Sequence, residues 1–532
     1  MLYNDQMLIG MKKDGTDQYL YTKMANRHGL IAGATGTGKT TTLKVLAESF
    51  SDAGIPVFLA DAKGDLRSIC EAGSDNDILI KRRSEMSLDE KGFQYKSYPV
   101  NFWDVYGEMG IPLRTTVSEM GPLLLSRIMN LNDTQSDILS IVFKIADEDD
   151  LLLIDTKDLK SMLQYVIEHA KELSVEYGNL PAASLNVILR AVIALEADGA
   201  DKFFAEPALN IKDWLAQDQY GRGFIQVLEC QKLMLNPRTY SMFLLWMISE
   251  LYETLPEAGD VSKPKMVFFF DEAHMLFDGA PKILLEKIEQ VVKLIRSKGV
   301  GIYFITQNPK DIPDGVLSQL GNKVQHALHA YTPSEQKYLK AAADGFRANP
   351  EFKTIDVLEE LGTGEALVSV LDESGVPTIV ERVMILPPQS YMGIIGDDAF
   401  SSKVECSYLY GKYNYYVDNE SAYERLTKIR EEEEVIKVQK EQEALSAKEA
   451  LAKKLAEDKA KAAAEKEALK KASEKNKVVN KVAKSVVNTT AGTIGRELGN
   501  SVGKTVGGSF GKRLGGNVGS TLARRIVGTL FK

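Results

Sequence analysis

Residues 29–40, with the sequence GLIAGATGTGKT, restrict the possible folds of this chain more than any other segment. A short apolar strand leads into a glycine-rich turn that starts at Gly33 and ends in Lys39 and Thr40, and residues 41–50 continue with apolar side chains at helical spacing. In such a turn the backbone N–H groups cradle phosphate, the lysine adds a positive charge, and the threonine hydroxyl can ligate Mg²⁺. The pattern predicts a strand, a phosphate loop and a helix that together bind a nucleoside triphosphate.

We expect every residue of this loop and of the first helical turn to line the nucleotide site. These residues are Gly33, Ala34, Thr35, Gly36, Thr37, Gly38, Lys39, Thr40 and Thr41. Lys39 is expected to bind the β- and γ-phosphates, and Thr40 to hold the cofactor Mg²⁺ together with an acidic residue from elsewhere in the chain.

Three further apolar runs of strand length lie at residues 56–61, 266–270 and 300–306. Uninterrupted apolar strands are typical of a parallel sheet that is covered on both faces. A helix expected at 281–298 separates the last two runs, because it starts with a proline and has a glycine just past its end. The alternation of strands and helices predicts an α/β fold with a parallel core sheet.

Polar residues directly follow two of these strands: Asp271 and Glu272 after 266–270, and Gln307 after 300–306. A carboxylate at the end of a strand beside a phosphate loop can hold Mg²⁺, so Asp271 is the expected second metal ligand. Glu272 is suited to be the general base for an attacking water, and Gln307 could contact the γ-phosphate or that water. This set favours hydrolysis of the nucleotide over binding alone.

Ring-shaped ATPases also use an arginine that stabilises charge on the nucleotide of a neighbouring subunit. Arg296, just before the strand at 300–306, is the expected residue, with Arg222 and Arg238 as alternatives. The guanine-recognition motif Asn-Lys-x-Asp does not occur, since residues 322–325 read Asn-Lys-Val-Gln. We therefore expect ATP and not GTP.

The phosphate-loop lysine and Asp271 are separated by far more residues than one step across a sheet requires, which predicts an insertion. The expected divisions are a β-hairpin region of the ATPase domain at 1–26, the first part of the core at 27–111, a large helical insertion at 112–260, the second part of the core at 261–395, a charged helical linker at 396–480 and a basic glycine-rich tail at 481–532.

Charge is distributed unevenly along the chain. The net charge is −9, but residues 481–532 hold nine Lys or Arg and one Glu, which leaves −17 for the rest. A nucleic acid must therefore meet a local basic surface. Glycine recurs every fourth residue from Gly495 to Gly519, which predicts either a flexible tail or a helix that docks on another copy or on an anionic membrane surface.

Cysteine usage and the distribution of apolar residues favour a cytoplasmic protein. The three cysteines are scattered without a CxxC pair, which argues against a disulfide framework or a zinc site. The N-terminal residues lack the pattern of a signal peptide, and no apolar run is long enough for a membrane helix.

The chain resembles the HerA–FtsK superfamily of RecA-like ring motors, and within it the bacterial HerA-like group of YjgR type. The resemblance covers about residues 5–395 and is carried by the segments HGLIAGATGTGKT from His28, FLADAKGDL from Phe58, GPLLLSRIMNLNDTQ from Gly121, VFFFDEAHMLFD from Val267 and IRSKGVGIYFITQNPKDIPDGVLSQLGNKVQHALHAYTP from Ile295. It implies a RecA-like P-loop NTPase fold, ATP and Mg²⁺, a homo-hexameric ring and translocation of double-stranded DNA. It also implies a nuclease or another DNA-processing protein as a partner.

Three functions are compatible with these observations. The resemblance and the complete hydrolysis set favour an ATP-driven motor on double-stranded DNA. The basic tail favours a membrane-associated ATPase that pumps DNA or protein, as in conjugation and secretion. The acidic charge of the remaining chain favours a scaffold whose slow hydrolysis times its assembly.

Overall fold

The computed structural model describes residues 1–259, 261–278 and 282–473, and a 13-stranded sheet forms the centre of its first compact unit, Met1–Glu433. In spatial order, the parallel strands are β11 (Asn322–Gln325), β4 (Gly29–Ala32), β10 (Val300–Thr306), β9 (Met266–Phe270), β5 (Val57–Asp61), β8 (Ile225–Glu229), β6 (Val100–Asp104) and β7 (Ile111–Pro112). Beyond β11, the sheet continues antiparallel through β12 (Glu365–Ser369), β13 (Glu381–Ile385), β2 (Gln6–Lys12) and β1 (Leu2–Tyr3), while β3 (Asp17–Leu20) pairs with β2. This order confirms the predicted RecA-like α/β class with a parallel core.

The central strands are buried along their whole length, as their apolar sequences predict. Every residue of β5, β9 and β10 is buried. Aromatic side chains fill the space beside them: the rings of Phe58 and Phe268 are 5.2 Å apart, and Trp214 stacks on Phe58 at the same distance. Because both faces of these strands are covered, their register is fixed by packing on either side.

That register brings the carboxyl ends of five strands to one edge of the sheet. Ala32, the last residue of β4, pairs with Thr306 of β10 and with Gln325 of β11. Phe270, which ends β9, pairs with Phe304 of β10 and with Ala60 of β5. The loops that follow β4, β5, β9, β10 and β11 therefore leave the sheet side by side, as expected for ligand sites of parallel α/β folds.

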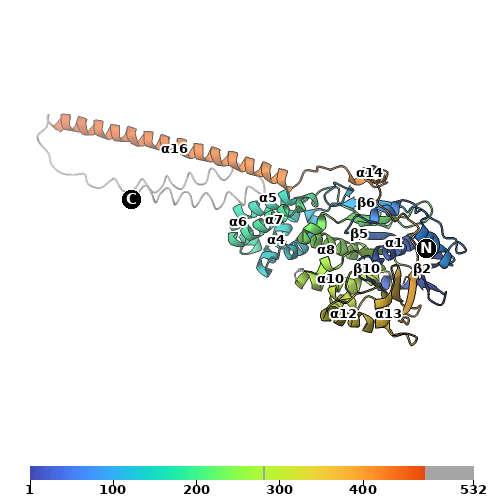
Figure 1. Cartoon of the computed structure of the whole chain (residues 1–532). Coiled ribbons are helices and arrows are strands. Elements are labelled where there is room, and N and C mark those ends of the chain that lie inside the picture. The colour runs from blue at the N-terminus through green and yellow to red at the C-terminus, as the bar shows by residue number, and fades with distance from the viewer. Residues whose placement is uncertain (260, 279–281, 474–532) are drawn as a thin grey trace. The chain divides into compact units, whose positions relative to one another are not determined.

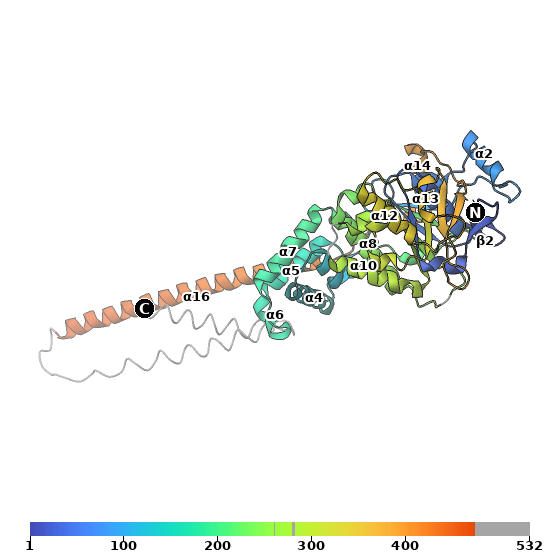
Figure 2. The ribbon, with the colours of Figure 1, turned by 60° about the horizontal axis from the view of Figure 1, so that its bottom comes forward.

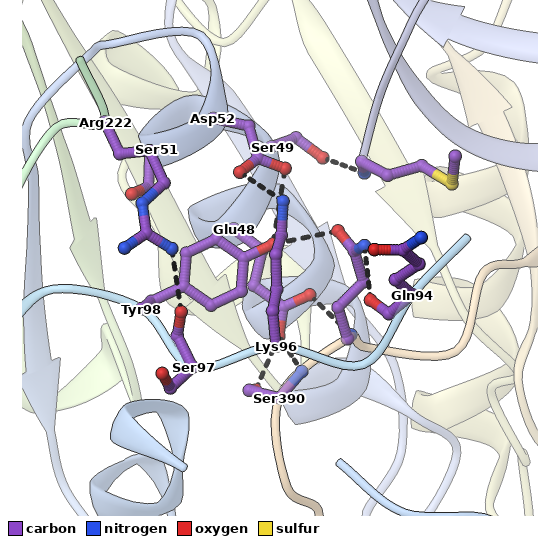
Figure 3. A network of polar contacts seen from close by, with 12 residues as sticks. Glu48, Ser49, Ser51, Asp52, Gln94, Lys96, Ser97, Tyr98, Arg222 and Ser390 are labelled. Carbon is purple, nitrogen blue, oxygen red and sulfur yellow. Dashed lines mark hydrogen bonds and ion pairs between the residues drawn. The ribbon is translucent and has the colours of Figure 1, made fainter. Parts of the chain in front are cut away.

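Helix α1 (Lys39–Asp52), which continues from the phosphate loop, is held by buried polar contacts (Figure 3). Glu48 is 1% exposed, and its carboxylate accepts hydrogen bonds from the backbone N–H of Gln389 at 2.8 Å and of Ser390 at 3.1 Å and from the Ser390 hydroxyl at 2.5 Å. One turn later, Asp52 pairs with Lys96 at 2.7 Å. The helix is thus tied to two segments that are distant in sequence.

A group of helices occupies much of the range 112–260, which the sequence predicts as a helical insertion. It contains α3 (Val117–Ile128), α4 (Asp133–Glu148), α5 (Thr156–Glu168), α6 (Ala170–Tyr177) and α7 (Ala182–Ala197), and α4 to α7 lie together in both views (Figures 1 and 2). One part of the prediction needs correction, because β8 lies in this range and pairs with β5 and β6 in the central sheet. The five residues of β8, IQVLE, contain a buried glutamine, Gln226, which hides the apolar strand pattern in the sequence.

The first unit also contains further helices and 3-10 turns. They are η1 (Thr22–Arg27), η2 (Leu66–Cys70), α2 (Asp77–Glu85), η3 (Ala200–Lys202), η4 (Ile211–Leu215), η5 (Leu233–Leu235), α8 (Pro237–Thr254), α9 (His274–Phe277), α10 (Lys282–Ile295), η6 (Arg296–Lys298), η7 (Pro309–Asp311), α11 (Asp314–Leu317), α12 (Pro333–Asp344) and α13 (Thr354–Glu360). The predicted helix at 281–298 is therefore α10 followed by one 3-10 turn.

The predicted boundary between core and linker at residue 396 also needs correction, because the first compact unit extends to Glu433. Helices α14 (Asp397–Glu405) and α15 (Tyr410–Tyr413) carry aromatic side chains into its core: Phe400 packs on Phe102 and Tyr413 on Trp103. Such short helices have too few turns to show an apolar period. Only the later part of α16 (Ala422–Ser473) belongs to the second unit, where residues 434–468 are exposed, and the predicted tail at 481–532 lies outside the described residues.

Among residues 1–259, 261–278 and 282–473, no single helix has the length and apolarity needed to cross a bilayer, and one bent pair, α6 with α7, meets the criterion only when the two helices are taken together.

The buried contacts of α1 lead to a stability prediction. Replacing Glu48 by Ala leaves two backbone N–H groups and one hydroxyl buried without an acceptor, so we expect unfolding to become easier by roughly 2–4 kcal/mol. Glu48→Gln keeps one acceptor oxygen and should lose less. Urea denaturation measures both, with exposed Glu90→Ala as a control that should change stability by less than about 0.5 kcal/mol. Equal stability of Glu48→Ala and Glu90→Ala would show that this network does not hold α1.

Candidate nucleotide site

The phosphate loop follows β4 and closes on itself through the side chain of Lys39. Lys39 is 7% exposed, and its ammonium donates to the carbonyl oxygens of Gly33 at 2.7 Å and Ala34 at 3.0 Å. Burial lowers the pKa of this ammonium, and the nearby Glu272 acts in the opposite direction. The hydroxyl of Thr37 donates to the Ala34 carbonyl at 2.7 Å. The positive charge of Lys39 is therefore already fixed against the backbone carbonyl groups of the phosphate loop.

At two positions of this loop, glycine is required both because the φ angle is positive and because a Cβ atom would come too close to neighbouring residues. Gly33 has a φ of 152°, and a Cβ there would lie 2.5 Å from the Cβ of His326. Gly38 has a φ of 113°, and a Cβ there would approach the Cα of Gly364 to 3.3 Å. A side chain at Gly33 would press on the residue that follows β11, and one at Gly38 on the residue that precedes β12.

His326, which directly follows β11, supports the loop from below. Its Nδ1 lies 2.8 Å from the Glu365 carbonyl oxygen, which can only accept, so Nδ1 carries the proton. Nε2 then accepts from the Thr42 hydroxyl of α1 at 2.8 Å. Burial lowers the pKa of His326 to about 4, so the ring is neutral in this arrangement. Sequence analysis assigned no role to His326.

Asp271 and Glu272 follow β9 at the same edge. Asp271 is 5% exposed, and burial raises the pKa of its carboxyl to about 6, against the influence of Lys63. Glu272 has a φ of 47°, a left-handed conformation that costs a residue other than glycine about 1–3 kcal/mol. The N–H of Ala273 donates to the Ile305 carbonyl at 2.8 Å, which fixes the chain at this bend. Strain of this kind persists where surrounding contacts define a functional geometry.

Three side chains contact the carboxylate of Glu272. The Lys63 ammonium lies 2.6 Å from Oε1, and His274 Nδ1 lies 3.3 Å from Oε2. The amide nitrogen of Gln307 is 3.4–3.5 Å from the two oxygens, which makes these long hydrogen bonds. Burial raises the pKa of Glu272, but the contacts with Lys63 outweigh it and leave this pKa below its usual value. The pKa values of the two adjacent carboxyls are thus shifted in opposite directions.

Gln307 connects this carboxylate to the phosphate loop. Its Oε1 accepts a hydrogen bond from the Thr35 hydroxyl at 3.4 Å while its Nε2 faces Glu272. A cavity of about 570 Å³ opens beside it and is lined by His274, Phe277, Asp278, Gln307, Lys310, Asp311 and Pro313. Solvent can therefore reach the residues around Glu272 from this side.

The structure brings together Lys39, Thr40, Asp271, Glu272 and Gln307, but it places Arg296 elsewhere. Arg296 lies in η6 at the amino end of β10, whereas Gln307 follows the carboxyl end of this seven-residue strand. Seven residues of strand span roughly 23 Å, so Arg296 is at the opposite edge of the sheet from the phosphate loop.

Oxygen donors suited to Mg²⁺ lie at the expected place. Thr40 is in the first turn of α1, and Asp271 is an adjacent buried carboxylate. Hydroxyl and carboxylate oxygens are the ligands that Mg²⁺ prefers. A bound cation also favours the ionised form of a buried carboxylate, which offsets the free-energy cost of its burial. The residues present therefore fit Mg²⁺.

Lys63 is the main residue that sequence analysis missed. Lys63 lies in the segment FLADAKGDL that carries part of the resemblance, but a lysine in a charged turn has no distinctive spacing. Its contact with Glu272 arises because β5 and β9 are neighbours in the sheet, which only the strand order establishes.

Comparisons with known proteins give a family and several relatives. The chain matches the family described as "Helicase HerA-like C-terminal" over residues 6–513. It is 24% identical over 359 residues to the DNA double-strand break repair helicase HerA of Sulfurisphaera tokodaii, covering 64% of this chain and 62% of that protein. It is 22% identical over 364 residues to the protein of the same description from Saccharolobus solfataricus, covering 64% and 61%. The chain thus spans about six tenths of the length of these relatives.

Among solved structures, VirB4 of Thermoanaerobacter pseudethanolicus is 18% identical, with 71% of this chain and 96% of that chain covered and a TM-score of 0.43. A structural overlap of this size does not by itself establish a shared fold. The fold assignment rests on the strand order and the phosphate loop described above.

The buried, neutral His326 leads to a pH prediction. Its folded-state pKa of about 4 lies below the ordinary value of 6.5, so the unfolded chain binds a proton between these values and the folded chain does not. The contribution of His326 to stability is therefore present above about pH 6.5 and is lost as the pH falls towards 4, by about 3 kcal/mol in total. Urea denaturation of wild type and His326→Leu at about pH 7 and pH 4 should show the smaller loss in the variant. Equal losses would contradict a buried neutral ring.

Proposed function

The chain belongs to the Helicase HerA-like C-terminal family, and on this premise we propose that it is an ATP-hydrolysing motor acting on double-stranded DNA. The observation that carries the proposal is the convergence of Lys39, Asp271, Glu272 and Gln307 at one edge of a parallel sheet. A phosphate loop alone supports nucleotide binding. A strained, buried glutamate beside it supports turnover, because strained backbone conformations of this kind cluster at functional sites.

Each residue has a distinct part in the proposed reaction. Lys39 exchanges its contacts with the Gly33 and Ala34 carbonyls for the β- and γ-phosphates. Thr40 and Asp271 would hold Mg²⁺, which would neutralise negative charge on the phosphate oxygens. Glu272 accepts the proton of the attacking water at a carboxylate oxygen, and Gln307 positions that water from the next strand.

We further propose that the chain acts as a homo-hexameric ring, in which Arg296 serves a neighbouring copy. The position of Arg296 at the amino end of β10 supports a role in a neighbouring copy, because the length of this strand separates Arg296 from the nucleotide site of its own chain. Stabilisation of transition-state charge by an arginine supplied by another molecule is a general device of nucleotide hydrolases. A DNA-processing protein such as a nuclease is the proposed partner of the ring.

Steady-state ATP hydrolysis, with and without linear double-stranded DNA, tests this proposal. We expect DNA to raise the turnover of the wild-type protein. Glu272→Gln should lower kcat by at least about 100-fold in both conditions, because the amide cannot accept the proton. Nucleotide binding should remain, since Lys39 and the phosphate loop are unchanged.

Glu90→Gln, at an exposed position outside the site, is the matched control and should hydrolyse ATP at the wild-type rate. Turnover that is indifferent to DNA would contradict a DNA motor and favour a membrane-associated pump or a nucleotide-timed scaffold. Full activity of Glu272→Gln would contradict the assignment of the base.

A further inference from the structure

The backbone of Lys63 is held by hydrogen bonds in a turn, whereas its long side chain is partly exposed to solvent. The buried carboxylate of Asp61 accepts hydrogen bonds from the backbone N–H groups of Lys63 at 3.2 Å, Gly64 at 2.7 Å and Leu66 at 3.0 Å. The Gln231 side chain also donates to the Lys63 carbonyl. The side chain of Lys63 itself is 46% exposed. Its backbone is therefore fixed beside β9, while its four-carbon stem has room to move the ammonium.

The partner of Lys63 is much more buried than Lys63. The side chain of Glu272 is 8% exposed, and its Oε1 is 2.6 Å from the Lys63 ammonium. A general base must place an oxygen within about 2.6–3.2 Å of the water it deprotonates. The ammonium on Oε1 takes up one of the lone pairs with which this carboxylate could accept a hydrogen bond from water. The observed arrangement therefore makes Lys63 a competitor of water for the proposed base.

Lys63 also shares its surroundings with the phosphate-loop lysine. Lys39 and Lys63 both interact electrostatically with Asp271 and Glu272, and they repel each other. A triphosphate bound along the loop would introduce several negative charges between these two cations. A phosphate dianion competes well with a single carboxylate for an ammonium, because charge-assisted hydrogen bonds strengthen with charge.

We propose that Lys63 is a second phosphate-binding lysine, held by Glu272 in the nucleotide-free protein and transferred to the terminal phosphate when a nucleoside triphosphate binds. The transfer frees Glu272 for water only when the terminal phosphate is present. A diphosphate leaves the Lys63–Glu272 pair in place. This inference rests on the proposed function, since it concerns the same nucleotide site.

Binding of Mg²⁺ with AMP-PNP or ADP, measured by titration calorimetry, tests the transfer without any turnover. Lys63→Met keeps most of the length of the side chain and removes the charge. We expect this variant to lower the preference for AMP-PNP over ADP by roughly tenfold, the effect of losing one hydrogen bond to a charged group. Lys63→Arg should retain most of the preference.

A comparison of single and double variants distinguishes transfer of the Lys63 ammonium to the phosphate from a Lys63 that stays paired with Glu272. Glu272→Gln releases Lys63, so it should tighten AMP-PNP binding several-fold, and this gain should vanish in Lys63→Met/Glu272→Gln. A gain of equal size in both backgrounds would reflect only the removal of a negative charge and would overturn the proposal. An unchanged nucleotide preference in Lys63→Met would overturn it as well.

The chain offers a matched control in the same turn. Arg67 forms an ion pair with Glu229, the last residue of β8, and it lies four residues after Lys63. Arg67→Met should leave the ratio of AMP-PNP to ADP affinity unchanged, and melting temperatures verify that all variants are folded. Failure of the wild-type protein to bind AMP-PNP at all would contradict the proposed function and, with it, the role of Lys63. Normal wild-type binding with no effect of Lys63→Met would contradict this inference alone.

Discussion

The parallel register of β4, β10, β9 and β5 is the constraint on which every feature of the site depends. Hydrogen bonding between these strands sets Ala32 beside Thr306, and Phe304 and Ala60 beside Phe270. Four loops with no sequence relation to each other therefore leave the sheet at one edge. A shift of one strand by a single residue would invert its side chains and separate its loop from the others. Complete burial of the central strands makes such a shift costly.

The site is also supported from the side opposite the nucleotide. His326 fills the space that a side chain at Gly33 would need, and it links α1 to the carbonyl of Glu365. Glu48 anchors α1 to the segment at 389–390. Because these groups are buried and hydrogen-bonded, the phosphate loop rests on a scaffold that resists displacement. Lys63 reaches the site from outside this scaffold, with a side chain that is 46% exposed.

Much of the fold and the positions of the candidate site residues could be predicted from the sequence, because their signals are local. The phosphate loop has a fixed spacing, and the three apolar runs around 56–61, 266–270 and 300–306 are strands within one residue of the expected bounds. Asp271, Glu272 and Gln307 were found because each follows such a run directly. The assignment of their roles remains a prediction.

The features that were missed depend on pairing between distant segments. Strand β8 has a polar residue at its centre, and its place between β5 and β6 follows from tertiary packing. Helices α14 and α15 join the first unit through single aromatic contacts such as Phe400 with Phe102. The pairing of Lys63 with Glu272 joins residues about 200 positions apart, and no local pattern records it.

The most direct test of this account is a structure of the protein with bound Mg²⁺ and AMP-PNP. The account predicts the triphosphate along residues 33–40, with the Lys39 ammonium moved from the carbonyls of Gly33 and Ala34 to phosphate oxygens and Asp271 at the metal. A nucleotide bound elsewhere, or a Lys39 that keeps its two carbonyl contacts in the complex, would contradict the central claim that this edge of the sheet is the site of ATP hydrolysis.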